Sequence, residues 1–316
     1  ESSKLDWDQI NLSQKQGQTR FRSHLTGFLN QLKPHLKPGS KVIFAHLMAG
    51  GIPRAKILMP LFNRIFKGKN DRYLSSKLFW DSELGKLCGK CFSEVTAWTF
   101  KTLLEESQEI QNWLEKNGGY ARYLAFGYHG TEVHSPSKNL FWQAYPSYLQ
   151  GWAKNELESY SNSHSVVFNC PEIMTSSSSI FVGVEITLYC LIRDLALSSN
   201  PHAKKMVHKI AELFKQKTNQ FPLIYDAIDD YFSNPIMADH KKFELWPQHN
   251  SPEQMKLKIE TSELLESFHT DIKHLASTPL SEMVIASCGK IILDEIENPR
   301  RSVTWLGHDI LMKALC

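Results

Sequence analysis

The sequence lacks the short motifs that most directly identify a nucleotide-binding or hydrolytic enzyme. Its 316 residues contain no Gly-x-Gly-x-x-Gly, no phosphate-binding P-loop and no Gly-x-Ser-x-Gly. The signatures of the usual dinucleotide-binding turn, of a P-loop NTPase and of a serine hydrolase with a nucleophile elbow are therefore missing. Evidence for function has to come from pairs of residues whose spacing carries chemical meaning.

Features of nucleic-acid-binding, membrane and metal proteins are also scarce. The net charge is only +3 and the basic residues are dispersed, so we expect no nucleic-acid partner. The longest apolar run, residues 180–192, contains Glu185 and is too short to span a bilayer. Among the six cysteines, Cys88 and Cys91 form one CxxC without a second pair, so we expect no metal. Cysteines without a framework spacing favour a reducing, cytoplasmic location.

Short apolar runs alternate with longer segments of helical periodicity. With 42% hydrophobic residues, the chain can bury a sizeable core. The apolar runs predict buried parallel strands at 41–46, 120–126 and 165–170. The periodic segments predict helices at 13–36, 94–116, 180–197 and 201–217. This alternation is typical of an α/β fold whose parallel sheet has helices on both faces.

We expect two regions along the chain. Residues 1–220 would form the sheet domain, interrupted by a partly helical insertion at about 55–92, and residues 221–316 would form a helical region packed on it. The first residue is Glu1 rather than methionine, so we expect the chain to be processed, trimmed or incomplete at its start.

A tyrosine and a lysine are the strongest candidates for chemistry. They bound the segment Tyr145-Pro-Ser-Tyr-Leu-Gln-Gly-Trp-Ala-Lys154, and in one regular helix they would lie on opposite faces. Because proline favours the first helical turn, Pro146 predicts that Tyr145 lies just before the helix and can lean toward Lys154. A nearby ammonium lowers the pKa of a phenol, which would make Tyr145 a usable proton donor. The alternative is that Tyr145 packs in the interior and Lys154 is solvated.

Small and polar residues follow the predicted strands, at 46–51, 127–130 and 171–179. Ligands of open α/β sheets bind beyond the carboxyl ends of the strands. Glycines there let the backbone approach a ligand, and hydroxyls near a helix start suit a phosphate. Each segment alone has a simpler reading, since a Ser/Thr run often only caps a helix.

Together these residues resemble the trans-2-enoyl-ACP/enoyl-CoA reductases of the FabV type, divergent members of the short-chain dehydrogenase/reductase superfamily. The resemblance rests on Tyr145-x8-Lys154, on Tyr128 at the end of a predicted strand, and on Glu172-Ile-Met-Thr-Ser-Ser-Ser-Ser-Ile180. It covers about residues 20–250.

The resemblance implies a fold, a reaction and a set of roles. The fold would be a Rossmann-like doubly wound parallel sheet, incomplete at the N-terminus, with a helical C-terminal extension. The reaction would be NADH- or NADPH-dependent reduction of the 2,3 double bond of an enoyl thioester, carried by CoA or acyl carrier protein, in fatty acid biosynthesis. Tyr145 would bond the thioester carbonyl and supply the proton, Lys154 would hold the nicotinamide ribose, and Tyr128 would lie near the acyl group. Cofactor contacts would also come from His46, Leu47, Thr175, Ser176 and Ser177.

The sequence departs from that family at its start. The glycine-rich strand, turn and helix that bind the pyrophosphate have no counterpart here, so the N-terminal cofactor-binding part is expected to be absent. Two other functions stay open: a carbonyl-reducing dehydrogenase of the same superfamily, and a non-catalytic Rossmann-like protein that pairs its open sheet edge with a partner. We expect a monomer or a homodimer.

Overall fold

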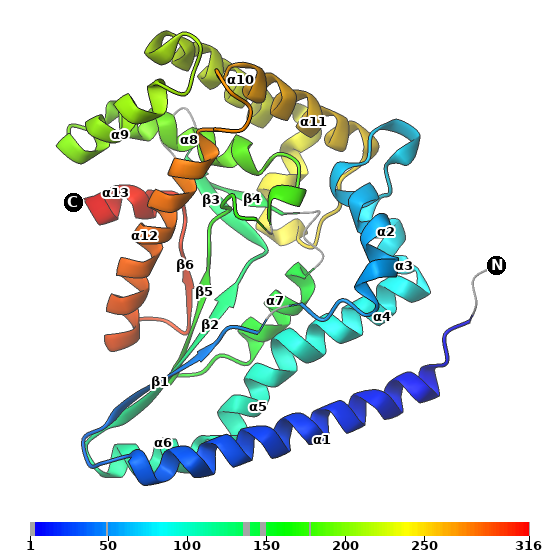
Figure 1. Cartoon of the computed structure of the whole chain (residues 1–316), viewed down its shortest axis with the longest axis vertical. Coiled ribbons are helices and arrows are strands. Elements are labelled where there is room, and N and C mark those ends of the chain that lie inside the picture. Colours follow the sequence, from blue (N-terminus) through cyan, green and yellow to red (C-terminus); the bar gives the residue numbers. More distant parts are fainter. Residues whose placement is uncertain (1–3, 49, 135–139, 146–149, 177, 316) are drawn as a thin grey trace.

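The computed structural model describes residues 4–48, 50–134, 140–145, 150–176 and 178–315. Figure 1 shows a central sheet surrounded by helices, with α10 and α11 at one end of the molecule and α1 and α6 at the other. The helices are α1 (Trp7–Leu32), α2 (Ala55–Lys67), α3 (Ser76–Asp81), α4 (Glu83–Phe92), a π-helical stretch (Ser93–Trp98), α5 (Thr99–Glu106), α6 (Gln108–Lys116), α7 (Gly151–Ser159), α8 (Val184–Leu197), α9 (Pro201–Ala211), α10 (Phe221–Ser233), α11 (Pro252–Ser267), α12 (Ser277–Glu297) and α13 (Asp309–Leu315). The strands are β1 (Lys41–His46), β2 (Tyr120–Gly127), β3 (Gly130–His134), β4 (Leu140–Ala144), β5 (Ser165–Asn169) and β6 (Val303–Trp305). Short 3-10 turns link several of them, among them η2 (Asn70–Arg72) and η4 (Ser178–Ile180).

Four parallel strands form the main sheet, in the order β1-β2-β5-β6. The predicted strands at 41–46, 120–126 and 165–170 are confirmed as β1, β2 and β5. β5 is buried as expected, whereas β1 is partly exposed because it lies at the edge of the sheet. In the part of the chain that the structure describes, β1 pairs on one side only, so the sheet has the open edge that was expected.

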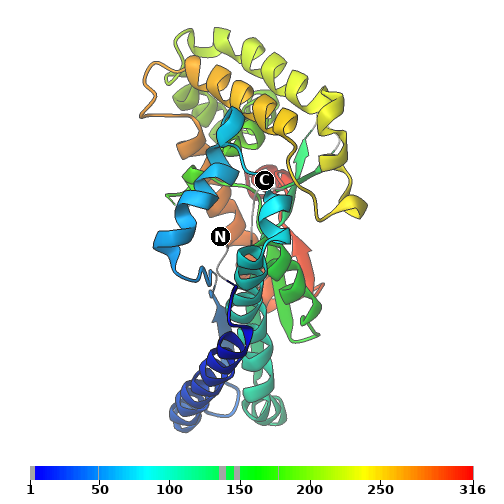
Figure 2. The same ribbon diagram turned by 90° about the vertical axis from the view of Figure 1, so that its right-hand side faces the viewer.

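Helices cover both faces of this sheet. Alternate residues of one strand point to opposite faces, and the core is divided accordingly. Tyr123 and Val167 face the core shared with α1, α5 and α6, whereas Leu124 and Phe168 face the core shared with α8, α10 and α12. Figure 2, turned by 90°, shows the long helices α1, α5 and α6 extending away from the end that carries α10 and α11. The α/β architecture with helices on both faces is thus confirmed.

A second, two-stranded sheet was not predicted. β3 and β4 pair antiparallel, with Val133 opposite Phe141, and the strand β4 runs directly into Tyr145. The helix expected to begin at about Pro146 instead begins at Gly151, as α7. Pro146 itself lies outside the described residues. Tyr145 follows the strand β4, and the expectation that Pro146 sets the start of the helix stays a prediction.

The insertion at about 55–92 folds into α2, α3 and α4 around a small core of its own. Phe62, Phe79 and Phe92 meet there, and Ala153 of α7 packs against them. The C-terminal region is not purely helical as expected, because β6 joins the sheet beside β5. One hydrophobic cluster contains residues from both sides of position 220, so α10, α11 and α12 pack directly on α8. The division into 1–220 and 221–316 stays a prediction.

Candidate active site

The carboxyl ends of β1, β2 and β5 meet at one edge of the sheet. His46, the last residue of β1, lies beside Ala125, and Gly127, the last residue of β2, lies beside Asn169 at the end of β5. The three segments that follow these strands leave from the same edge. This is the place where open α/β sheets bind ligands, and it brings most of the candidate residues into one region.

Lys154 is buried at this edge, although lysine is rarely found inside proteins. Its Nζ donates a 2.7 Å hydrogen bond to the main-chain carbonyl of Phe126, near the end of β2. Burial lowers the pKa of Lys154 to about 8, while Cys170 and Glu158 oppose that shift. Burial, and then the nearby charge of Lys154, lower the pKa of His46 to about 4, so this imidazole is neutral at pH 7. The alternative that Lys154 is a solvated surface residue is excluded.

Two phenols lie together beside it. Tyr145 is buried and its main-chain N–H donates to the carbonyl of His129 over 3.3 Å. The ring of Tyr128 lies 4.7 Å from that of Tyr145, centroid to centroid, at an interplanar angle of 43°. The predicted pairing of Tyr145 and Tyr128 in one region is therefore observed.

The hydroxyl of Tyr145 is buried without a hydrogen bond of normal geometry to any described residue. Burial raises its pKa well above 10, and Tyr128 and Glu172 add to the rise, which the nearby Thr131 partly offsets. This direction is opposite to the one expected from a neighbouring ammonium. Lys154, whose pKa is about 8, is not among the groups that shift the pKa of Tyr145. Tyr145 is thus a protonated phenol at neutral pH.

A half-buried carboxyl, Glu172, completes the region, and no role of its own was predicted for it from the sequence. It follows β5, and Thr187 of α8 donates a 2.9 Å hydrogen bond to its Oε2. Burial raises the pKa of Glu172 to about 8, against the opposing effect of Lys258 on α11. Burial also lowers the pKa of Lys258, and Glu172 and Glu185 limit that decrease. An acid directly after a buried strand was the signal that could have identified it.

The Thr/Ser loop after β5 is closed by its own side chains. The N–H of Thr175 donates to Ser178 Oγ over 2.7 Å, the N–H of Ser178 donates to Thr175 Oγ1 over 3.1 Å, and Ser178 Oγ donates to the carbonyl of Ile173. Ser176 is exposed, and Ser177 lies outside the described residues. These side chains bond within the loop and do not cap α8, whose N-cap is Gly183, and contact of the loop with a cofactor stays a prediction.

The other two candidates differ in exposure. His46 is buried, and its Nε2 lies 2.8 Å from Thr99 Oγ1. Leu47, directly after it, is 69% exposed, so its side chain is not packed in the site. The loop continues through Gly50 and Gly51, both at positive φ, a conformation that glycine adopts without strain.

Comparison with known proteins gives one family. The family described as enoyl-acyl carrier protein reductase FabMG matches residues 1–315. The chain belongs to this family. A solved structure described as the apo structure of FabMG, a novel type of enoyl-acyl carrier protein reductase, is 37% identical, with a TM-score of 0.94, over 99% of this chain and 72% of that chain. An NADH-bound structure of FabMG is 38% identical, with a TM-score of 0.73, over 86% of this chain and 68% of that chain. No curated protein matches.

Membership of the FabMG family confirms the prediction of an enoyl reductase and of an enzyme. It assigns the chain to the FabMG type of enoyl reductase, and the likeness to the FabV type stays a prediction. A solved FabMG structure binds NADH, one of the two cofactors expected.

In this FabMG-family chain, one buried histidine contacts the helix that carries Lys154. His129 is fully buried, and its Nδ1 lies 3.1 Å from Glu158 Oε1 on α7. The same carboxyl oxygen accepts a 2.9 Å hydrogen bond from Asn169 Nδ2 at the end of β5. Rings packed around His129 are those of Trp142, Phe243, Trp246 and Trp305. Glu158 therefore fixes α7, which carries Lys154, to the ends of two strands.

The CxxC lies on α4, where the carbonyl of Cys91 packs against Gly51 of the loop after β1. Cys88 is buried in the core of the insertion, and burial raises the pKa of its thiol to about 12. Among the described residues no group of three or more His, Cys, Asp or Glu side chains is arranged to hold a metal ion. Within the same residues no helix is both long and apolar enough to cross a bilayer.

Proposed function

We propose that this chain reduces the carbon–carbon double bond of an enoyl group carried by acyl carrier protein, with NADH as the hydride donor. The observation that carries the proposal is the buried hydroxyl of Tyr145, which lacks a hydrogen-bond partner among the described residues, beside Tyr128. It lies in the region of the sheet edge where Lys154 is buried. Membership of the FabMG family supports this reaction.

The residues present fit the nicotinamide end of such a cofactor. The ammonium of Lys154 is a donor suited to ribose hydroxyls, and the neutral His46 lies near it. A Cβ at Gly50 would meet no atom within 4 Å, so the backbone after β1 leaves room for a ligand there, whereas Gly51 lies against the carbonyl of Cys91. When bound, the nicotinamide supplies a hydride to the β-carbon of the enoyl group.

Tyr145 acts on the substrate oxygen. As the β-carbon gains its hydride, negative charge develops on the thioester carbonyl oxygen. A protonated phenol that points at this oxygen stabilises that charge, and a buried donor does so more strongly than one in water. The raised pKa of Tyr145 keeps the phenol protonated for this task. One proton, supplied by Tyr145 and replaced from solvent, is then added at the α-carbon and completes a saturated thioester. Two C–H bonds form, while the C=C π bond, the C–H bond of the hydride donor and the O–H bond of the acid are broken.

Lys154 acts through its charge and its position. Its pKa of about 8 leaves it mostly charged at neutral pH, and its bond to the Phe126 carbonyl holds it at the sheet edge. Tyr128 forms the wall beside Tyr145 and is proposed to contact the acyl group. Thr175, Ser176, Ser177 and Leu47 remain proposed cofactor contacts. The FabV-type Rossmann-like sheet, use of NADPH or enoyl-CoA, a cytoplasmic location and a monomeric or homodimeric state remain proposals as well.

The test is a direct assay of the purified protein. Oxidation of NADH is followed by absorbance after addition of crotonyl-ACP, with crotonyl-CoA and acetoacetyl-CoA in parallel. We expect oxidation with the enoyl substrates, no oxidation with the ketone, and loss of rate in Tyr145→Phe. Oxidation with acetoacetyl-CoA alone would favour a carbonyl reductase. Absence of oxidation with every substrate would contradict the proposal.

A further inference from the structure

A tight turn gathers positive charge at the end of α2. Gly68 ends this helix, and a Cβ at that position would lie 2.3 Å from the carbonyl oxygen of Arg64 and 2.6 Å from Tyr73 Cα. The chain therefore folds back closely on the helix. Arg64 Nε donates a 3.0 Å hydrogen bond to the carbonyl of Arg72, which fixes the two arginines side by side.

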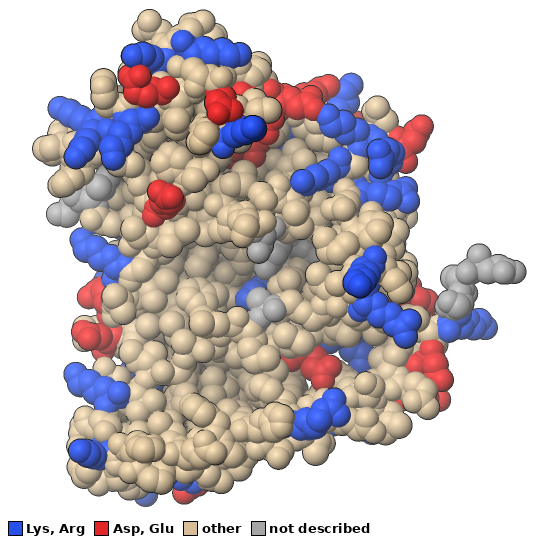
Figure 3. All heavy atoms as spheres, in the orientation of Figure 1, with Lys and Arg blue, Asp and Glu red and all other residues tan. Residues whose placement is uncertain are grey.

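This fold-back forms a cavity of about 650 Å³ that we call the α2 groove. Its lining contains four cationic and no acidic side chains: Pro60, Asn63, Arg64, Lys67, Gly68, Lys69 and Arg72. All four cationic residues are exposed. Figure 3 shows Lys and Arg side chains gathered on the side of the molecule where α2 and α11 lie.

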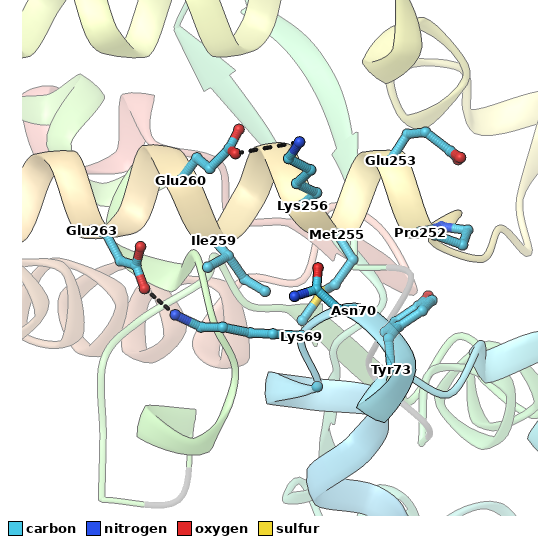
Figure 4. Close-up of a pocket in the computed structure, with 11 residues that line it drawn as sticks. Lys69, Asn70, Tyr73, Pro252, Glu253, Met255, Lys256, Ile259, Glu260 and Glu263 are labelled. Atoms are coloured by element: carbon cyan, nitrogen blue, oxygen red, sulfur yellow. Dashed lines mark hydrogen bonds and ion pairs between the residues drawn. The ribbon is translucent and has the colours of Figure 1, made fainter.

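The neighbouring pocket has balanced charge. It measures about 470 Å³ and lies between the same turn and α11. Figure 4 shows its two lysines in ion pairs, Lys69 with Glu263 and Lys256 with Glu260. By contrast, the ion pairs among the described residues include none with Arg64, Lys67 or Arg72. The α2 groove thus keeps uncompensated positive charge.

Helix stability explains only part of this charge. Cations in the last turn of a helix interact favourably with its dipole, which accounts for Arg64 and Lys67. Lys69 and Arg72 lie beyond the helix, where this effect is small. Lys69 is paired with Glu263, but placing Arg72 beside the other cations of the groove costs repulsion. An anionic partner would remove that repulsion.

The α2 groove adjoins the candidate active site. The N–H of Val182, in the segment between Glu172 and α8, donates to the carbonyl of Phe66 over 3.4 Å. The ring of Phe66 lies 4.5 Å from that of Phe181, centroid to centroid. The helix end that carries the cations is therefore packed against the segment that follows β5, which also forms the site.

From these observations we infer that the α2 groove docks the acidic face of the acyl carrier protein that delivers the enoyl group. This inference rests on the proposed function. Exposed, flexible cations over a wide cavity fit a protein surface better than a single phosphate, which is usually held by fixed backbone N–H groups or buried donors. Such a patch steers an acidic partner and raises its association rate.

The test compares two charge-matched double variants of the whole chain. Lys67→Gln with Arg72→Gln removes two charges from the α2 groove, while leaving Arg64 and its bond in place. Lys204→Gln with Lys209→Gln removes two exposed charges from α9, which lies on α8 away from the α2 groove. The KM is measured for crotonyl-ACP and for crotonyl-CoA at low and at high salt.

We expect the groove variant to raise the KM for crotonyl-ACP by about tenfold at low salt and to lose most of its salt dependence. The α9 variant should change the KM for crotonyl-ACP by less than about twofold. Both variants should change the KM for crotonyl-CoA by less than about twofold. An equal effect of both variants would overturn the inference, and so would an equal rise for crotonyl-CoA, which would assign the groove to a small anion.

A binding measurement tests docking independently of the proposed reaction. Labelled acyl carrier protein without an acyl group is titrated with each variant, and its anisotropy is measured. Weaker binding by the groove variant supports docking even if no substrate is reduced, in which case only the proposed function fails. Equal binding by the groove and α9 variants contradicts docking even if reduction is observed.

Discussion

Lys154 Nζ and the carbonyl oxygen of Phe126 are joined by a 2.7 Å hydrogen bond that links α7 to the end of β2. The bond holds the ammonium at the sheet edge. The two residues that the sequence pairs by their spacing are both buried. Tyr145 remains protonated through burial, and Lys154 is available to a ligand's hydroxyl groups.

Removing the phenolic oxygen should abolish most of the activity without unfolding the protein. We expect Tyr145→Phe to lower kcat by about 100-fold to 1,000-fold, as loss of one donor to a developing oxyanion typically does. The control is Tyr160→Phe, whose hydroxyl bonds only Glu156 on the same helix. Steady-state kinetics and circular dichroism provide the measurements. Equal rates in Tyr145→Phe and wild type would show that the phenol is not used.

Lys154 should affect cofactor binding and its pH dependence. Loss of a charged hydrogen bond in Lys154→Met should raise the KM for NADH by about 10-fold to 100-fold, whereas Lys116→Met, an exposed lysine of α6, should not. Since the pKa of Lys154 is about 8, the wild-type affinity for NADH should fall as pH rises through 8. A wild-type affinity that stays constant from pH 7 to pH 9 would contradict this assignment.

Glu172 should make the fold less stable as pH rises. Its folded-state pKa of about 8 exceeds the unfolded value of 4.5, so the folded state binds the proton more tightly. Stability is therefore highest below pH 4.5 as far as this group is concerned, and is lost as pH rises toward 8. Glu172→Gln should be more stable than wild type at pH 8 by about 1 kcal/mol, with little difference at pH 5. Urea unfolding at both pH values measures this.

The exposed Glu297→Gln on α12 serves as the control for that measurement and should show no pH-dependent gain. If Glu172→Gln were as stable as wild type at pH 8, the carboxyl would have to ionise normally in the folded state.

Replacement of two different glycines by alanine should change the free energy of unfolding in opposite directions. Gly68→Ala places a Cβ against the carbonyl oxygen of Arg64, so we expect a loss of about 1–3 kcal/mol in unfolding free energy. Gly289 lies inside α12 with no atom within 4 Å of a Cβ, so Gly289→Ala should gain about 0.5–1 kcal/mol. Thermal unfolding of both variants checks this. Unchanged stability in Gly68→Ala would show that the turn can relax.

The parts of the fold that were predictable are those with a strong local pattern. The runs 41–46 and 165–170 each have a continuous apolar centre, Val42–Ala45 and Val166–Phe168, so their assignment to strands follows from sequence. The hairpin of β3 and β4 was missed because its strands are short and mix apolar with polar residues. The strand β6 has three residues and is defined only by its pairing with β5.

The sequence predicts which residues form the site, but it does not predict the direction in which their pKa values shift. Spacing and strand ends pointed to Tyr145, Lys154 and Tyr128. The direction of the pKa shift of Tyr145 depends on tertiary burial and on Glu172, which no local pattern reveals. The proximity of His46 to Lys154 likewise exists only after β1 has paired with β2.

The place of β6 in the sheet has a consequence for the order in which the molecule folds. β6 pairs with β5 although α8, α9, α10, α11 and α12 separate them along the chain. Contacts between such distant segments form slowly, because the entropy cost of closing a long loop precedes the favourable contact energy. During synthesis, β5 must therefore keep its outer edge unpaired until these five helices have emerged. We expect nascent chains to depend on chaperones during this interval.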